Sequence, residues 1–214
     1  SAGPGGRGVS LVQVGGTFHR TGGGRLLRTN PVEATAVVAE VLRRFEVAAP
    51  AVPSIGVVTV NAPQRSLIEA QLRDSGDQRV VDALDRTDGE GVFVKNLENV
   101  QGVERDVVLF STGFSPDERG NLPLNFGPLN RAGGERRLNV AVTRARRQVV
   151  VFTSFAPEQL RAEQTASLGV QHLRAYLDLA ALGTDALPRG ARPAGGAGPA
   201  PGRRSPPRCG SADW

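Results

Sequence analysis

The spacing of apolar residues predicts a long helix near the start of the chain. Valine, leucine and phenylalanine recur every three or four residues between positions 37 and 45, which places them on one side of a helix. Asn30 precedes this segment as a helix N-cap, and Pro31 suits the first turn, where a missing N–H has no consequence. We therefore expect a helix over residues 31–47 with one side facing a core.

Short apolar runs rich in β-branched residues predict strands in the rest of the chain. The strands are expected at residues 9–14, 55–60, 92–94, 106–111 and 148–153. Further helices are expected at residues 63–74 and 135–146, after Pro157 and after Thr165. Because strands and helices alternate and the central strands are apolar throughout, we predict an α/β fold with a mainly parallel sheet covered by helices on both faces.

Composition divides the chain into three parts. Residues 1–24 form a Gly-rich segment with one strand, residues 25–182 form the α/β domain, and residues 183–214 form a tail. Since 13 of the 32 tail residues are Gly or Pro, we expect this tail to be disordered. Within the domain, residues 113–134 are too long and too rich in Gly, Pro and Asn for an ordinary connection, and ligands of such sheets lie at the carboxyl ends of strands.

Several classes of protein are disfavoured by composition. Cys209 is the only cysteine, and His19 and His172 lie far apart, so we expect neither a disulfide nor a structural metal. No apolar run reaches the roughly 18 residues of a membrane span, and no signal segment opens the chain, so we expect a cytoplasmic protein without membrane contact. The chain starts at Ser1 and contains no Met, from which we expect a segment of a longer protein.

The basic composition gives little support for nucleic-acid binding by itself. The net charge is +5, but 25 of the 26 basic residues are Arg, which is typical of GC-rich codon usage. Residues 183–214 carry a net charge of +3, which leaves only +2 for the remainder of the chain. The folded part is therefore close to neutral, and function has to be argued from motifs instead.

A phosphate-binding loop is absent from the sequence. The G-x-x-x-x-G-K-[ST] motif requires Lys after Gly, whereas Lys95, the only lysine, follows Val94. The pair Asp117-Glu118 lies in a Pro-containing loop and does not follow a strand as a magnesium-binding acid would. We therefore expect the isolated chain to be inactive as an ATPase.

Two polar stretches stand beside the last two buried strands. The first reads Q-G-V-E-R-D at residues 101–106, and the second reads R-R-L-N-V-A-V-T-R-A-R at residues 136–146. On a continuous helix over 135–146, Leu138, Ala141, Val142 and Ala145 form one apolar stripe. The same helix would align Arg137 with Arg144 and Asn139 with Arg146, and would end at Arg147. Taken alone, the second stretch also fits a surface helix with solvated arginines.

Together and in this order, the two stretches resemble motifs five and six of superfamily-one helicases. The segment I-G-V-V-T-V-N-A-P-Q-R at residues 55–65 lies where such proteins carry motif four. Within this superfamily the likeness is closer to RNA-surveillance (nonsense-mediated decay) helicases and their bacterial multidomain relatives. The segments K-N-L-E-N-V-Q-G at 95–102 and N-F-G-P-L-N at 125–130 favour the bacterial branch. The resemblance implies a second, C-terminal RecA-like domain of the P-loop NTPase type that lacks the P-loop itself.

The resemblance also implies roles for individual residues. Arg144 matches the arginine finger that neutralises charge on the γ-phosphoryl group of ATP. Glu104 matches an acid that helps to hold the nucleotide near the ribose, and Gly102 lets the backbone approach that ligand. The candidates for coupling or nucleic-acid contact are Gln101, Arg137, Asn139, Thr59 and Asn61.

The implied partners follow from the same family. ATP and Mg²⁺ would be shared with an N-terminal RecA-like domain of the same protein, which would hold the magnesium. The surface along which such a helicase moves on its substrate, its track, would bind single-stranded DNA or RNA. Two other interpretations remain open: a non-catalytic RecA-like module that binds nucleic acid or a partner, and a truncated relic. A small-molecule enzyme on a doubly wound sheet is disfavoured because no Gly-rich cofactor turn is present.

Overall fold

A five-stranded parallel sheet forms the centre of the protein. The computed structural model describes residues 8–183, and the strand order is β1-β7-β6-β4-β5. The strands span Gly8–Gln13 (β1), Ile55–Thr59 (β4), Phe93–Asn96 (β5), Arg105–Ser111 (β6) and Ala145–Thr153 (β7). All four neighbouring pairs are parallel. The predicted α/β fold, typical of a RecA-like domain, is therefore confirmed.

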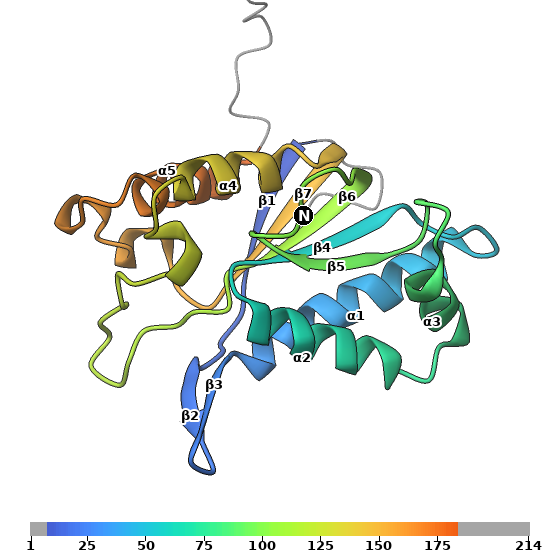
Figure 1. Ribbon diagram of the computed structural model, residues 1–214, viewed down its shortest axis with the longest axis horizontal. Helices are drawn as coiled ribbons and strands as arrows, with labels where there is room; N and C mark the ends of the chain where they lie inside the picture. The colour runs from blue at the N-terminus through green and yellow to red at the C-terminus, as the bar shows by residue number, and fades with distance from the viewer. Residues whose placement is uncertain (1–7, 184–214) are drawn as a thin grey trace, which may run out of the picture.

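Helices cover both faces of this sheet, as Figure 1 shows. One face carries α1 (Pro31–Ala48), α2 (Ala62–Arg73) and α3 (Gln78–Asp85), and the other carries α4 (Gly134–Val142) and α5 (Leu168–Leu182). Neighbouring residues of one strand therefore serve different cores: Leu109 packs with α1 and α2, while Phe110 packs with α4 and α5. This two-sided burial explains why the central strands are apolar at every position.

The start of α1 is tied to the sheet by polar contacts. Asn30 is the N-cap, and its side chain accepts a hydrogen bond of 3.1 Å from the Glu33 N–H. The Asn30 N–H, which a residue of the helix itself often satisfies, donates instead to Gln64 Oε1 of α2 at 2.8 Å. The Glu33 side chain is therefore available for contacts elsewhere, at the carboxyl ends of the strands.

Several local elements differ from the sequence prediction. The Gly-rich start contains an antiparallel hairpin, β2 (His19–Gly22) and β3 (Arg25–Thr29), which the sequence did not reveal because β2 is exposed at all four positions. Helix α3 was missed as well, since it is only two turns long. Pro157 begins a single 3-10 turn instead of a helix, whereas the helix expected after Thr165 is α5. The predicted disorder of the tail lies outside the described residues.

The helix predicted over 135–146 was wrong in its last four residues. Helix α4 ends at Val142, and β7 already begins at Ala145. The Thr143 hydroxyl still donates to the Asn139 carbonyl at 2.8 Å, as it can in a helix, but from Ala145 onward the chain pairs with β6 as an extended strand. Arg144 and Arg146 therefore do not align with Arg137 and Asn139 on a helix. Ala145 and Arg147 are likewise strand residues.

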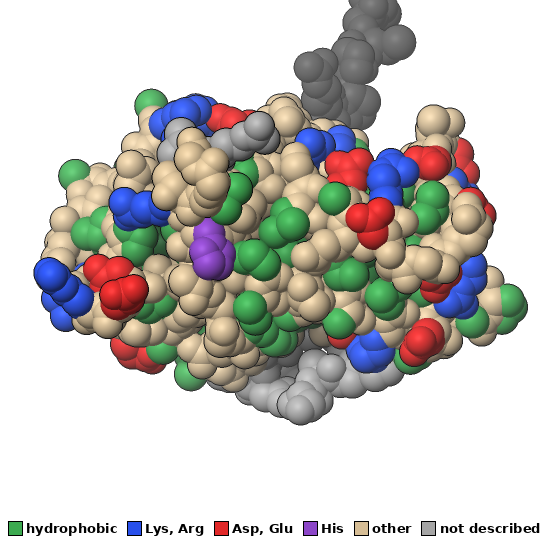
Figure 2. Space-filling view, turned by 90° about the horizontal axis from the view of Figure 1, so that it is seen from below, with side chains coloured by type: hydrophobic (Ala, Val, Ile, Leu, Met, Phe, Trp, Pro, Cys, Tyr) green, Lys and Arg blue, Asp and Glu red, His purple; other side chains and the backbone are tan. Residues whose placement is uncertain are grey.

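The described part of the chain shows no membrane-spanning element. Among residues 8–183, no helix is long and apolar enough to cross a bilayer. The face that carries α1 to α3 has basic and acidic side chains interspersed, without a continuous field of either sign (Figure 2). This distribution agrees with the near-neutral charge of the domain and again directs attention to particular side chains.

Candidate functional site at the amino ends of two strands

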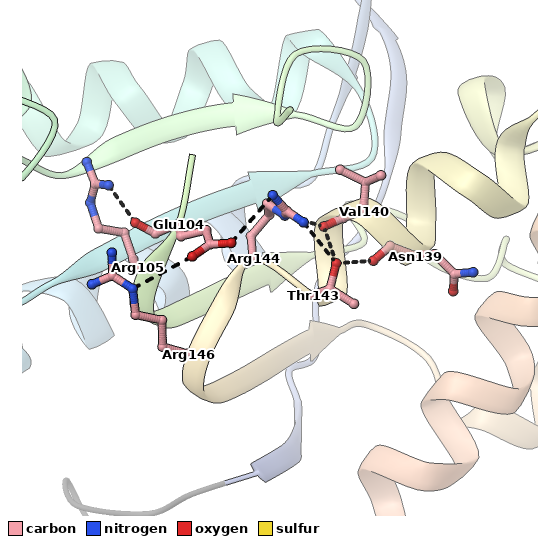
Figure 3. A network of polar contacts seen from close by, with 7 residues as sticks. All are labelled: Glu104, Arg105, Asn139, Val140, Thr143, Arg144 and Arg146. Carbon is pink, nitrogen blue, oxygen red and sulfur yellow. Dashed lines mark hydrogen bonds and ion pairs between the residues drawn. The ribbon is translucent and has the colours of Figure 1, made fainter. Parts of the chain in front are cut away.

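The two polar stretches meet because β6 and β7 are neighbours. The first stretch leads into β6 and the second leads into β7, and Arg105 pairs with Ala145 in the register. The Arg105 N–H donates to the Arg144 carbonyl at 3.0 Å. Glu104 and Arg144, which are forty positions apart in sequence, therefore stand side by side at the amino ends of the two strands (Figure 3).

Glu104 lies between two arginines. Its carboxylate is 3.8 Å from Arg144 Nη1 through one oxygen and 3.8 Å from Arg146 Nε through the other. Arg146 is also 3.7 Å from a carboxylate oxygen of Asp106. These distances are long for hydrogen-bonded ion pairs, and half-exposed pairs of this kind contribute only about 0 to 1 kcal/mol to stability. An incoming anion can therefore replace the Glu104 carboxylate at little cost.

The guanidinium of Arg144 is oriented by the end of helix α4. Arg144 Nε donates to the Val140 carbonyl at 2.9 Å, and Nη2 donates to the Thr143 hydroxyl at 3.3 Å. The Arg144 side chain is only 22% exposed, whereas that of Arg146 is 51% exposed. Arg144 thus presents Nη1 from a fixed position. A planar fork held in this way suits recognition of a phosphate.

Arg105 is a contributor that sequence reasoning missed. It is buried, its Nε donates to the Gly91 carbonyl at 2.6 Å, and its Nη1 donates to the Glu104 carbonyl at 2.7 Å. Its guanidinium carbon also lies 5.1 Å from the centre of the Phe93 ring. Burial lowers the pKa of Arg105 below its ordinary value. Arg105 therefore holds the backbone of Glu104. In the sequence, the signal for this role was a charged residue at the first position of a buried strand.

The turn before β6 leaves open space near this cluster. Gly102 has a φ of +81°, and a Cβ placed there would meet no atom within 4 Å. Glycine is therefore required by the backbone conformation, and the surrounding space is free for a ligand. Gln101 is exposed in the same turn.

Arg137 and Asn139 lie on α4 but do not join the cluster through their side chains. Arg137 Nη1 donates to the Ala132 carbonyl at 3.0 Å and to the Pro128 carbonyl at 3.4 Å, so it fastens the loop before the helix. Asn139 is exposed and takes part in the network of Figure 3 only through its backbone carbonyl. Their predicted coupling roles stay predictions.

Thr59 and Asn61 lie at the opposite end of the sheet. Thr59 is fully buried, and its hydroxyl donates to the Asn61 carbonyl at 2.7 Å. The Asn61 side chain caps α2 by accepting a hydrogen bond from the Gln64 N–H at 2.8 Å. The geometry therefore gives Thr59 a structural contact, and of the two residues Asn61 is the one that borders a surface hollow. The predicted sites divide between the two ends of the strands, whereas sequence reasoning placed ligands at the carboxyl ends alone.

A buried acid at the carboxyl ends was also missed. Glu33 accepts hydrogen bonds of 2.7 Å from both the Ser111 hydroxyl and the Gly113 N–H, and one of 3.0 Å from the Ser154 hydroxyl. Burial raises the pKa of Glu33 to about 7, although the hydrogen bonds that it accepts act in the opposite direction. From sequence alone, Glu33 is an ordinary acid of a first helical turn, and only the fold reveals its burial.

The residues that the structure describes do not provide a metal site. Within the range 8–183, no group of three or more His, Cys, Asp and Glu side chains is placed to hold a metal ion. The polar cluster at β6 and β7 pairs the guanidinium groups of Arg144 and Arg146 with the carboxylates of Glu104 and Asp106, so these two acids already face cations and do not suit Mg²⁺. A guanidinium that exchanges its carboxylate for a phosphate is the contact that this cluster can offer to a nucleotide.

Comparison with known proteins identifies the family of the chain. The family model described as "AAA domain" matches residues 5–155, a range that contains both polar stretches. Two relatives, described as uncharacterized ATP-dependent helicases of Mycoplasma genitalium and Mycoplasma pneumoniae, are each 38% identical over 128 residues. The match covers 58% of this chain but only 11% of each relative, so the chain spans about a tenth of the length of these curated relatives.

Proposed function

The chain belongs to the AAA domain family, and we propose that it is the second RecA-like motor domain of an ATP-dependent superfamily-one helicase. The observation that carries this proposal is the meeting of Glu104 and Arg144 at the amino ends of β6 and β7. The similarity to ATP-dependent helicases supports a helicase-type domain. A C-terminal position and a kinship with the RNA-surveillance type are parts of the proposal that rest on the motifs.

In this proposal Arg144 is the arginine finger. ATP, bound to a second domain, approaches the cluster. A phosphate oxygen then replaces the Glu104 carboxylate as the partner of Arg144 Nη1. The long 3.8 Å pair with Glu104 makes this exchange inexpensive, and the bond from Nε to Val140 keeps the guanidinium in place during it. The positive charge then stabilises the negative charge that develops on the transferring phosphoryl group.

Glu104 has a second task in the same scheme. Arg105 holds the backbone carbonyl of Glu104, and the Glu104 carboxylate accepts hydrogen bonds and therefore suits the hydroxyl groups of a ribose better than a phosphate. The open space over Gly102 is where the nucleotide lies. Gln101, Arg137 and Asn139 stay candidates for coupling nucleotide closure to the nucleic-acid strand, and this part of the proposal rests on the motifs alone.

The remaining groups that hydrolysis requires belong to another domain. This chain has no phosphate-binding loop, and magnesium is held by a RecA-like domain outside it. ATP and Mg²⁺ therefore act at an interface, and single-stranded DNA or RNA runs over both domains. We expect the isolated chain to bind nucleotide weakly and not to hydrolyse it, as a non-catalytic binding module would.

The test is ATP hydrolysis by the full-length protein, measured with and without single-stranded DNA or RNA. Arg144→Ala is expected to reduce strand-stimulated hydrolysis by about 10³- to 10⁵-fold, the usual range for loss of an arginine finger. Arg144→Lys keeps the charge but not the fork, so it is expected to restore only a small part. The control, Arg43→Ala, removes an equal charge from the surface of α1 and is expected to hydrolyse ATP normally.

Two results separate the possible interpretations. Normal hydrolysis by Arg144→Ala would show that another residue serves as the finger and would refute the assignment. Absence of hydrolysis in the full-length wild type, with its strand present, would favour the non-catalytic binding module. Glu104→Gln is expected to raise the KM for ATP more than it lowers kcat, since its contact is with the bound nucleotide.

A further inference from the structure

A groove at the carboxyl end of the sheet carries the chemistry of a strand-binding surface. It consists of two adjoining hollows of about 740 and 520 Å³ that share Phe18, Arg20 and Pro123. One wall is the β2–β3 hairpin and the other is the loop over residues 114–131, which stand at the same end of the molecule in Figure 1. The groove lies at the end opposite to the Glu104–Arg144 cluster, so it is separate from the proposed ATP site.

An aromatic ladder supports the floor of this groove. The Phe18 ring packs against Phe114 with ring centres 4.7 Å apart and planes tilted by 32°, and Phe114 packs against Phe126 at 4.5 Å with a tilt of 48°. Phe126 then meets Phe155 edge-on at 6.2 Å inside the core. The Phe18 N–H donates to the Ser115 hydroxyl at 2.7 Å, which fixes the backbone at this point. Phe18 is only half-buried, so a rigidly supported ring faces the groove.

Three arginines border the same hollow. Arg20 and Arg28 come from the hairpin, and both are exposed. Among residues 8–183, neither side chain makes an ion pair or a hydrogen bond with another described residue. Arg131 comes from the opposite wall and pairs with Glu98 at 3.1 Å, but this pair is largely exposed and therefore weak. The single carboxylate of the larger hollow, that of Glu98, is thus already matched, which leaves Arg20 and Arg28 for an anionic ligand. The smaller hollow adds the carboxylate of Asp117, so the three arginines and two acids give the whole groove a net charge of +1.

The two hollows favour an extended ligand over a compact one. They adjoin at Phe18 and Arg20, so a ligand that occupies both extends past these residues, whereas a mononucleotide can be accommodated in one of them. Arginines beside an aromatic ring match the way in which proteins hold single strands without reading their sequence. Asn61, the motif-four residue, borders the same hollow and adds an amide that can contact a phosphate or a sugar.

We propose that this groove binds a single nucleic-acid strand, with Arg20 and Arg28 on its phosphates and one base stacked on Phe18. The proposal rests on the helicase function proposed above and assigns part of its track to a hairpin that no motif marks. The motif-four position itself offers no aromatic side chain. Phe18, which is distant from this position in sequence, borders the same hollow as Asn61 and provides the aromatic ring.

The experiment measures binding of dye-labelled oligo-dT and oligo-U by the 214-residue chain, using fluorescence anisotropy over a range of salt concentrations. The double variant Arg20→Ala/Arg28→Ala is expected to lower the slope of log affinity against log salt by about 1.4, since each lost phosphate contact on a single strand accounts for about 0.7. Phe18→Leu is expected to weaken binding by about 5- to 150-fold, the range for losing one stacked base.

Two controls make the result specific. Arg43→Ala/Arg79→Ala removes two charges from helices α1 and α3, away from the groove, and is expected to keep the wild-type slope. An oligomer with abasic positions is expected to bind wild type and Phe18→Leu equally, because stacking is then lost in both. Thermal unfolding measures the stability of each variant. If Phe18→Leu is less stable than wild type, the salt dependence of the Arg20→Ala/Arg28→Ala variant, in which both replaced side chains are exposed, tests the proposal.

The proposal is overturned by any of three results. These are no binding by the wild-type chain, wild-type binding by the double arginine variant, or displacement of the strand by a free mononucleotide at equal nucleotide concentration. The last result would instead indicate a nucleotide pocket. Each of them leaves the Arg144 test untouched, because finger-dependent hydrolysis is measured in the full-length protein and depends on the opposite end of the sheet.

Discussion

Replacing Glu33 with Gln is expected to remove a pH dependence from the stability of the domain. The acid is fully buried and its pKa is raised from 4.5 to about 7. The folded state therefore binds a proton more tightly than the unfolded state, so the stabilising contribution is complete below about pH 4.5 and is lost as the pH rises through about 7. Because one pKa unit corresponds to about 1.4 kcal/mol, the unfolding free energy falls by about 3 kcal/mol over this range.

The substitution preserves the shape of the network. The amide oxygen of Gln can accept from the Ser111 hydroxyl and the Gly113 N–H, and its NH₂ group can donate to the Ser154 oxygen, which lies 3.0 Å from the present carboxylate. The variant carries no titrating group at this position. It is therefore expected to gain about 3 kcal/mol relative to wild type between pH 4.5 and pH 8.5.

The assay is urea unfolding of both proteins followed by circular dichroism at several pH values. The quantity to compare is the difference in unfolding free energy between variant and wild type, since other titrating groups cancel in it. Glu46→Gln, at an exposed position of the same helix, is the matched control substitution. A constant difference for Glu33→Gln, within about 0.5 kcal/mol, would refute the claim that Glu33 is protonated on folding.

Two further substitutions test the packing and the site. Gly134→Ala places a Cβ 2.1 Å from the Leu129 carbonyl oxygen and is expected to lower the unfolding free energy by about 1 to 3 kcal/mol in a thermal unfolding experiment. Gly15→Ala, with open space around the new Cβ, is expected to lower it by less than about 0.5 kcal/mol. Equal losses in the two variants would contradict the close contact at Gly134. Arg105→Met leaves the Gly91 carbonyl without its donor, so we expect a loss of about 1 to 3 kcal/mol in stability together with a raised KM for ATP in the full-length protein. An unchanged KM would show that Arg105 does not position Glu104.

Most of the fold is predictable from local patterns in the sequence. The apolar runs at β4 and β6 indicated strands buried on both faces, and the pair Asn30-Pro31 marked the first residue of α1 correctly. These signals work because they depend on neighbours within one turn or one strand. The hairpin β2–β3 gave no such signal, since exposed polar residues have no preferred spacing, and α3 was too short to show one.

The candidate site was only partly predictable. The two motifs pointed to Glu104, Arg144 and Gly102, and the structure brings the first two together beside the turn that contains the third. Sequence reasoning placed Arg144 on a helix, because residues 135–146 have helical spacing throughout. Competition from the β6–β7 pairing ended that helix at Val142, and local spacing contains no information about such a distant partner.

The sequence by itself therefore determined the class of the fold, the order of its main elements and the identity of the polar motifs. Only the tertiary structure decided where those motifs meet, that Arg105 holds Glu104, and that Phe18 reaches the hollow bordered by Asn61. It also turned Glu33 from an ordinary first-turn acid into a buried group with a raised pKa. The physical reason is that periodicity reports contacts within a few residues, whereas strand order, register and burial are set by residues that are distant in the chain.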